Sequence, residues 1–321
     1  MPAKNAAKYI SQSIISILSQ TYSEIELIIF NDNSNDNTKE IINDFKKNDN
    51  RISLIDSCES VGISFALNTA IYQAKGKYIA RMDADDIANE SRIEKQKNFM
   101  ETNNLDVCGS QITFFNSDSF RFFSNLDLPI ENELIKYSML FINPFAHPTI
   151  FGKRDFFVNN PYISKFDGVE DFELWSRFIN NSFIKFANYP FSLLNYRVHD
   201  SQFSRTFNKE RSFKLSEIKT SNWEKLSLVH PSLLYFKNRE INNLDEIIYS
   251  YEFILKKLDK KLIPLFQKYF SSFFNIYTCK DDYKIIYFEV LIKTVGKRLF
   301  IRRLSIDFFR LIKSIFINRT K

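Results

Sequence analysis

The sequence contains little cysteine, glycine or proline. Its 321 residues include 3 Cys, 6 Gly and 8 Pro, and Cys58, Cys108 and Cys279 lie far apart, without a Cys-x-x-Cys or Cys/His metal-binding spacing. An odd number of widely separated cysteines excludes a disulfide framework and a zinc-finger type of site. The low Gly and Pro content excludes collagen-like and linker-dominated architectures. We therefore expect a globular protein of a reducing compartment, the cytoplasm.

Long apolar runs are also absent. No segment reaches the ~18 uninterrupted apolar residues that a transmembrane helix requires. The first thirty residues lack the basic, apolar and small-residue order of a secretory signal peptide. The hydrophobic content of 44% is ordinary for a globular protein with a core. We therefore expect the protein to remain inside the cell.

Positive charge is concentrated at the C-terminal end. Residues 297–321 carry eight Lys or Arg and one acid, a net charge of +7, whereas the whole chain carries +6. Apolar residues repeat there at helical spacing: Leu304, Phe308, Leu311, Ile312 and Ile315. The pattern predicts a basic amphipathic helix, which would lie on the anionic inner face of the cell membrane or pack on the protein. No nucleic-acid recognition motif accompanies it, so we expect no nucleic-acid partner.

Helical and strand-length patterns alternate through the first part of the chain. Helical spacing of apolar residues marks residues 6–20, 38–47 and 62–73. Short apolar runs of strand length mark residues 25–30, 51–55 and 78–82. Strands that alternate with helices predict an α/β fold with a mostly parallel sheet flanked by helices.

The pattern changes after about residue 210. Long helical stretches rich in Leu, Ile, Phe and Lys follow, at residues 244–262 and 282–293. We therefore expect a catalytic domain at residues 1–210 and a helical C-terminal region at residues 211–321.

Three acidic residues follow directly on the apolar run at residues 78–82. They form the sequence Asp83-Ala84-Asp85-Asp86. Three carboxylates in four residues repel one another, so they are costly to hold at a strand end without a compensating cation or donors. Oxygen ligands suit Mg²⁺ or Mn²⁺, and such an ion can bridge two phosphates. The cluster indicates a metal site, although a solvated acidic turn accounts for the same spacing.

A second acidic pair begins a short helical pattern. Leu174 and Trp175 predict a buried helix face, which places Glu170 and Asp171 in the first turn. Acids in a first turn also stabilise the helix dipole, so a structural role explains them as well. A catalytic base for an alcohol acceptor must be a carboxylate within hydrogen-bonding reach of the hydroxyl. Either acid suits that role.

Read together and in order, seven stretches resemble the family 2 glycosyltransferases, whose catalytic domain has the GT-A fold. The stretches are Pro2-Ala3-Lys4-Asn5, Ser19-Gln20-Thr21-Tyr22, residues 26–36, Gly62 with Asn68, residues 81–86, Glu170-Asp171 and Tyr196-Arg197-Val198-His199. Seven ordered matches are far more specific than any single one.

The resemblance implies roles on the donor side. Asp32, with Asn31 beside it, would hold the nucleotide base, and Asp83 would contact the ribose. Arg197 would lie near the diphosphate. An anionic nucleotide diphosphate cannot approach a carboxylate such as Asp85 without a cation, so the dependence on a metal follows from charge.

The resemblance also implies the metal ligands and the base. Asp85, with Asp83 and His199, would bind Mg²⁺ or Mn²⁺. Asp171 would be the general base, with Glu170 beside it. His147, in the segment 143–149, would line the acceptor pocket or serve as a turn histidine. Inversion requires the base and the metal to lie on opposite sides of the sugar.

Two features depart from the family pattern. The family's first strand precedes the Pro-x-x-Asn segment, whereas here Met1 stands directly before Pro2. We therefore expect this strand to be missing and the true start to lie upstream of Met1. Asn31 and Asn33 stand where the family usually has an acid and glycine. Asparagine tolerates the left-handed turn conformation that glycine adopts.

These patterns together predict a metal-dependent, inverting glycosyltransferase. It would move a sugar from a nucleoside diphosphate donor, a UDP-sugar, to a saccharide or lipid-linked acceptor in bacterial surface-polysaccharide assembly. Two alternatives remain open: a nucleotidyltransferase, which also uses metal-binding acids on an α/β sheet, and a truncated, noncatalytic relative. A Gly-rich triphosphate loop would favour the nucleotidyltransferase, and the sequence shows none.

Overall fold

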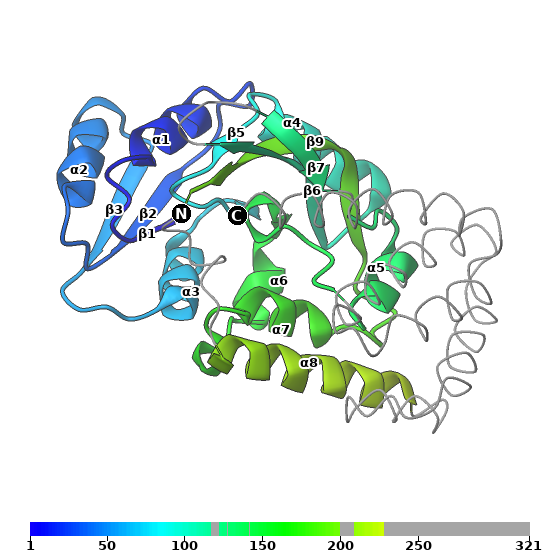
Figure 1. Cartoon of the computed structure of the whole chain (residues 1–321). Helices are drawn as coiled ribbons and strands as arrows, with labels where there is room; N and C mark the ends of the chain where they lie inside the picture. Colours follow the sequence, from blue (N-terminus) through cyan, green and yellow to red (C-terminus); the bar gives the residue numbers. More distant parts are fainter. Residues whose placement is uncertain (117–121, 127, 141, 200–208, 228–321) are drawn as a thin grey trace, which may run out of the picture. The chain divides into compact units, whose positions relative to one another are not determined.

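The computed structural model describes most of the first 227 residues (Figure 1). The described residues are 1–116, 122–126, 128–140, 142–199 and 209–227. The chain divides into two compact units, Met1–Asn222 and Trp223–Lys321. The predicted boundary near residue 210 stays a prediction. The predicted helices at residues 244–262 and 282–293 and the basic tail lie outside the described residues.

A three-stranded parallel sheet forms the N-terminal part. It contains β1 (Pro2–Ala3), β2 (Leu27–Asp32) and β3 (Ile52–Ser57) in the order β1-β2-β3. Helices α1 (Ile10–Leu18), α2 (Thr38–Asn48) and α3 (Ile63–Gln73) alternate with these strands. In Figure 1, α1 and α2 lie together and apart from α3. The alternation predicted from the apolar spacing is confirmed, because its apolar residues form the core: Ile10, Ile14, Ile29 and Ile42 are fully buried.

The second sheet is mixed. Its strands follow the order β4 (Tyr78–Ala80), β8 (Phe151–Lys153), β6 (Val107–Asn116), β9 (Phe186–Val198) and β5 (Ile87–Ala88), with β7 (Phe122–Leu126) paired to β6. Among the described strands of this second sheet, only β6 and β9 pair in parallel. The connection from β6 to β7 is too short for the crossover that a parallel pair needs. The α/β class is confirmed, with more antiparallel pairing than the first three strands indicate.

Five further α-helices and two 3₁₀ turns complete the described structure. They are α4 (Arg92–Asn103), α5 (Asn132–Ser138), α6 (Arg154–Asn159), α7 (Glu170–Ser176), α8 (Lys209–Ser227) and the 3₁₀ turns η1 (His147–Thr149) and η2 (Ser164–Phe166). Trp175 of α7 is fully buried, and its ring centroid lies 5.2 Å from that of Phe145 and 6.2 Å from that of Phe186 on β9. Edge-to-face aromatic packing of this kind fixes α7 against the sheet.

The two-residue strand β1 lies at the edge of the first sheet. Pro2 and Ala3 pair in parallel with Phe30 and Asn31 of β2. Met1 extends the ladder, because its amino nitrogen donates to the Ile28 carbonyl at 2.9 Å and its carbonyl accepts from the Phe30 N–H at 2.9 Å. The expectation that the family's first strand is missing stays a prediction.

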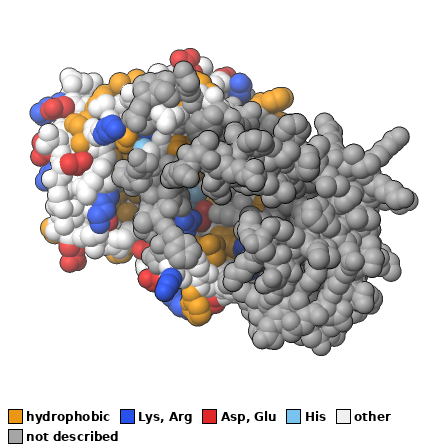
Figure 2. All heavy atoms as spheres, viewed as in Figure 1, with side chains coloured by type: hydrophobic (Ala, Val, Ile, Leu, Met, Phe, Trp, Pro, Cys, Tyr) orange, Lys and Arg blue, Asp and Glu red, His pale blue; other side chains and the backbone are white. Residues whose placement is uncertain are grey.

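The described surface carries mixed charge. Figure 2 shows acidic and basic side chains interspersed on the described part of the face it draws. This agrees with the sequence, in which most of the net positive charge lies in residues 297–321. Within the described residues, no helix combines the length and the apolar character needed to cross a bilayer.

Candidate active site

The loop between β4 and β5 gathers three acids, which we call the first acidic cluster: Asp83, Asp85 and Asp86. A carboxylate oxygen from each lies within 4.8 Å of one from the others. The side chains of Asp83 and Asp85 are 28% exposed, whereas Asp86 is fully buried. Burial, followed by repulsion from neighbouring carboxylates, raises the pKa of Asp85 and raises that of Asp86 further.

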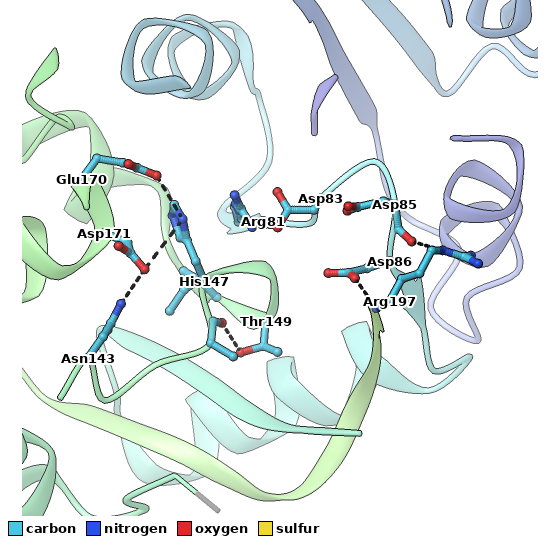
Figure 3. Close-up of polar contacts among 12 residues, drawn as sticks. Arg81, Asp83, Asp85, Asp86, Asn143, His147, Thr149, Glu170, Asp171 and Arg197 are labelled. Carbon is cyan, nitrogen blue, oxygen red and sulfur yellow. Dashed lines mark hydrogen bonds and ion pairs between the residues drawn. The ribbon is translucent and has the colours of Figure 1, made fainter. Parts of the chain in front are cut away.

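Cationic or protonatable groups partner two of these acids. The Arg81 guanidinium lies 2.6 Å from Asp83 Oδ2, and Figure 3 draws the two side chains next to each other. His199 Nε2 lies 3.0 Å from Asp85 Oδ2. The predicted neighbours Asp83, Asp85 and His199 are therefore brought together. These contacts hold the acids in place but leave part of each exposed side chain open to a ligand.

The third acid of the first acidic cluster is incompletely bonded. Asp86 Oδ1 accepts the backbone N–H of Arg197 at 2.9 Å, whereas its buried Oδ2 has no hydrogen-bond partner among the described residues. A buried carboxylate oxygen without a donor is costly, and a nearby cation would offset that cost. Hard oxygen ligands in a cluster of this size fit Mg²⁺ or Mn²⁺. The residues present therefore fit a divalent metal ion.

Arg197 is buried behind this loop. Its Nε donates to the Asp85 carbonyl at 2.6 Å and its Nη2 donates to Gln12 Oε1 at 2.5 Å. The guanidinium carbon lies 4.5 Å from the ring centroid of Tyr9 and 4.6 Å from that of Phe115. Arg197 thus lies beside the first acidic cluster, and its contacts fix the backbone of the loop; its predicted place near the diphosphate stays a prediction.

The second acidic cluster, Glu170 and Asp171, begins α7. Asn143 Nδ2 donates to Asp171 Oδ2 at 2.6 Å, and the Gly168 N–H donates to Glu170 Oε2 at 2.7 Å. His147 Nδ1 lies 3.5 Å from Glu170 Oε1 and 4.0 Å from Asp171 Oδ2. Figure 3 shows these side chains converging from α7, η1 and the loop before η1. The two predicted base candidates are therefore neighbours with different partners.

Burial sets the protonation of the second acidic cluster. It raises the pKa of Glu170 to about 7, with the charge of Asp171 adding to the effect, and it raises the pKa of Asp171. Burial, and then the charge of Arg81, lowers the pKa of His147 well below its usual value, so the imidazole is neutral at pH 7. His147 Nε2 lies 3.0 Å from the Tyr162 hydroxyl, which fixes the ring.

Arg81 and Arg92 connect the two clusters. The charge of Arg81 acts on Glu170 as well as on Asp83, and Figure 3 draws Arg81 between the two groups. Fully buried Arg92 of α4 donates through Nη2 to the Arg81 carbonyl at 2.6 Å and through Nε to Gln96 Oε1 at 3.0 Å. Gln96 in turn donates to the Thr149 carbonyl of η1 at 2.8 Å. One helix therefore holds both the loop of the first cluster and the turn of His147.

Asn31 and Asp32 lie at the carboxyl end of β2, in the other sheet. Asp32 Oδ1 accepts the Val61 N–H at 2.7 Å, and Asn31 Nδ2 donates to Asp56 Oδ1 at 2.7 Å. Asn33 adopts a φ of 51°, the left-handed conformation expected where the family usually has glycine. The end of a parallel strand is where such sheets bind ligands.

Comparison with known proteins identifies the family. Residues 1–159 match the model of Glycosyl transferase family 2. The chain is 38% identical over 196 residues to the O-antigen biosynthesis glycosyltransferase WbnJ of Escherichia coli, which covers 60% of this chain and 76% of WbnJ. This chain belongs to glycosyl transferase family 2.

A second relative and a solved structure agree with family 2 membership. The Escherichia coli UDP-Glc:alpha-D-GlcNAc-diphosphoundecaprenol beta-1,3-glucosyltransferase WfgD is 32% identical over 211 residues, covering 65% of this chain and 80% of WfgD. The structure of S. aureus TarS 1-349 in complex with UDP-GlcNAc gives a TM-score of 0.56 at 15% identity, covering 85% of this chain and 78% of that chain. At this identity TarS shows the fold alone. The predicted glycosyltransferase fold is confirmed.

Sequence reasoning about this family 2 chain missed three polar residues. Arg92 and Gln96 occur in a helix that looks polar and solvent-exposed in sequence, yet both are buried. Asn143 lies in the segment already noted for His147, but spacing alone does not show that it reaches Asp171. The sequence contains one feature that could have indicated a role for Asn143: it is a polar residue directly before Pro144 in an otherwise apolar stretch.

Proposed function

We propose that this family 2 glycosyltransferase transfers a sugar from a UDP-sugar to a saccharide on a lipid carrier, with inversion, in surface-polysaccharide assembly. The names of two relatives support this: WfgD uses a UDP-linked donor and a diphosphoundecaprenol acceptor, and WbnJ serves O-antigen biosynthesis. Family membership favours glycosyl transfer over nucleotidyl transfer. A single observation carries the proposal: the structure contains two acidic clusters with different partners. The first cluster contacts the cationic Arg81, and the second accepts hydrogen bonds from the neutral Asn143 amide and from backbone N–H groups.

The first acidic cluster is the proposed donor site. Asp83, Asp85 and His199 would hold Mg²⁺ or Mn²⁺. The fully buried Asp86 accepts the backbone N–H of Arg197, which fixes β9 against the loop that carries these ligands. When bound, the ion neutralises the diphosphate leaving group. Arg197 contributes near the diphosphate by fixing the Asp85 backbone.

The end of β2 completes the proposed donor site. Asn31 and Asp32 would contact the nucleotide base, and Asp83 would contact the ribose. These side chains already have protein partners, which orient them before the nucleotide arrives. Preorganised groups lose less entropy on binding than mobile ones.

The second acidic cluster is the proposed base site. The carboxylate of Asp171 accepts the proton of the acceptor hydroxyl while the hydroxyl oxygen bonds to C1 of the sugar. The bond from C1 to the diphosphate oxygen breaks, and its electron pair leaves with the nucleoside diphosphate. Asp171 suits the role better than Glu170 because its side chain is 16% exposed, against 6% for Glu170. The Asn143 amide aims the carboxylate without adding charge.

The cellular place of the reaction is also a proposal. A lipid-linked acceptor would require the enzyme to work at the inner face of the cell membrane, as a peripheral protein. The basic amphipathic pattern of residues 297–321 supports contact with anionic lipid. Removing residues 297–321 should abolish binding to anionic liposomes and leave binding to neutral liposomes unchanged. Retained binding to anionic liposomes would contradict this part of the proposal.

A transfer assay tests the proposed function. The purified protein would be incubated with Mn²⁺, a diphosphoundecaprenol-linked acceptor and, in separate reactions, UDP-, dTDP- and GDP-linked sugars. We expect a product only from UDP donors, with an anomeric configuration opposite to that of the donor by NMR. Transfer from another nucleotide class, retention of configuration, or no transfer by a folded protein would contradict the corresponding part of the proposal.

A further inference from the structure

Helix α3 lies between two parts of the proposed site. It contacts β2, which ends at Asp32, and it also contacts η2, which leads into α7 and the second acidic cluster. In Figure 1, α3 is drawn between the N-terminal sheet and α6. The bonds at the start of this helix therefore determine how the two parts are joined.

The start of α3 is bonded to Asp32. The Val61 N–H, just before the helix, donates to Asp32 Oδ1 at 2.7 Å. Gly62 follows with a φ of 84°, a conformation that residues other than glycine rarely adopt, and the helix begins at Ile63. The carboxylate of Asp32 and the turn at residues 61–64 are thus held together.

The same turn is bonded to Asp167, which lies far away in the sequence. Asp167 Oδ1 accepts the Ser64 N–H at 3.2 Å. The N–H groups in the first turn of a helix have no partner within the helix, and a carboxylate there also interacts favourably with the helix dipole. A Cβ atom on Gly62 would collide with Asp167 Oδ2. Glycine is therefore needed at residue 62 for the approach of Asp167 as well as for the backbone conformation.

A tight turn joins Asp167 to the second acidic cluster. Asp167 lies three residues before Glu170. The Val169 N–H donates to the Phe166 carbonyl at 2.9 Å, and the Gly168 N–H donates to Glu170 Oε2 at 2.7 Å. Because both bonds close the turn, a displacement of Asp167 is passed on to the carboxylates at the start of α7.

A second contact from α3 holds the other end of this loop. Asn68 Nδ2 donates to the Tyr162 carbonyl at 2.8 Å, and Asn68 Oδ1 accepts the Tyr162 N–H at 2.9 Å. The Tyr162 hydroxyl in turn lies 3.0 Å from His147 Nε2. Asn68 therefore fixes the start of the loop, whereas Asp167 connects its end to the turn that holds Asp32.

We propose that Asp167 is a positioning residue that couples the nucleotide end of the site to the catalytic base. The inference rests on the proposed function, in which Asp32 contacts the nucleotide base and Asp171 accepts the proton of the acceptor hydroxyl. Asp167 acts through the turn at residues 61–64 on one side and the turn at residues 166–170 on the other. It thereby keeps the bound donor and the base at one fixed separation. Transfer depends on that separation, because a small displacement of a reacting group lowers the rate by a large factor.

A double-mutant cycle tests the coupling without any substrate. Asp32→Ala should speed amide exchange at Gly168 and Val169 at least fivefold, because it releases the start of α3. In the Asp167→Ala chain the same change should have no further effect at these two amides, since the link is already cut. Asp167→Asn keeps an oxygen for the Ser64 N–H and should restore the dependence on Asp32. Equal effects of Asp32→Ala with and without the Asp167 carboxylate would overturn the proposal.

A kinetic measurement distinguishes positioning from structural support alone. Asp167→Ala should lower kcat for transfer about tenfold and leave donor KM within about twofold, whereas Asp167→Asn should stay near the parent. Asp155→Ala removes an exposed acid of α6 and is the control for lost charge. An unchanged kcat in folded Asp167→Ala would overturn the proposal and leave the proposed function intact. Absence of transfer by the parent chain would contradict the proposed function, and the exchange measurements would then decide the coupling.

Discussion

The two acidic clusters contain the same kind of residue in opposite surroundings. In the first acidic cluster, Arg81 contacts Asp83 and His199 contacts Asp85, whereas Asp86 Oδ2 has no donor within the part of the chain that the structure describes. The second acidic cluster is held by neutral groups, chiefly the Asn143 amide and backbone N–H groups. Three clustered carboxylates, one of which has a buried oxygen without a donor among the described residues, suit the binding of a cation. Two carboxylates held by neutral donors suit a proton acceptor.

The largest expected effect falls on the second acidic cluster. Asp171→Asn removes the proposed base, so turnover should fall about 1,000-fold. Glu173→Gln, on the same helix but bonded to Arg177, is the matched control and should retain most activity. Steady-state assays at saturating donor check both variants. Full activity in Asp171→Asn would contradict the assignment of the catalytic base to the second acidic cluster.

Arg92→Met should affect both clusters together. It leaves the Arg81 carbonyl and Gln96 without their buried donor, so we expect a loss of about 3 kcal/mol in the free energy of unfolding. Donor binding and turnover should fall in parallel, because both loops lose their support. Urea unfolding measures the stability, and Lys95→Met on the exposed face of α4 is the control. A change confined to one cluster would show that Arg92 does not connect them.

Glu170 should make stability depend on pH. Its folded pKa is about 7, above the ordinary 4.5, so the folded state keeps a proton that the unfolded state loses between these values. Stability therefore falls as pH rises from about 4.5 to 7 and is constant above 7. Glu170→Gln removes this penalty, and its stability relative to the parent should be about 2 kcal/mol higher at pH 8 than at pH 5. A pH-independent difference would contradict the assignment.

The smallest effect should come from the residue that orients the base. Asn143→Ala removes the amide that aims Asp171, so turnover should fall about tenfold with little change in donor KM. The pH at which activity is half-maximal should rise, because the lost donor stabilised the Asp171 carboxylate. Asn143→Gln tests for rescue by a longer amide. Loss of activity without a shift in the pH profile would indicate a purely structural role.

The sequence predicted those parts of the fold that depend on local spacing. The helices α2 and α3 and the strand β2 follow apolar periods, and the first acidic cluster follows a strand end, where ligands gather. The pairing of β6 with β9 could not be predicted, because it joins Val107 to Phe186 through packing that no local period encodes.

The rest of the site depends on contacts between distant residues. Arg92 and Asn143 are polar residues whose importance arises from hydrogen bonds to other segments of the chain, Arg92 to the Arg81 carbonyl and Asn143 to Asp171. Asp86 is distinguished from Asp83 and Asp85 only by its complete burial, which repeated acids in a sequence do not reveal.

The most direct test of the two roles is calorimetric titration of UDP into the parent chain, Asp85→Asn and Asp171→Asn, each with and without Mn²⁺. Asp44→Asn, an exposed acid on α2, is the control for lost charge. We predict that Mn²⁺ strengthens UDP binding to the parent, to Asp171→Asn and to Asp44→Asn, and that Asp85→Asn loses this gain. Equal Mn²⁺-dependent binding in Asp85→Asn, or its loss in Asp171→Asn instead, would contradict the assignment of the metal-bound donor to the first acidic cluster.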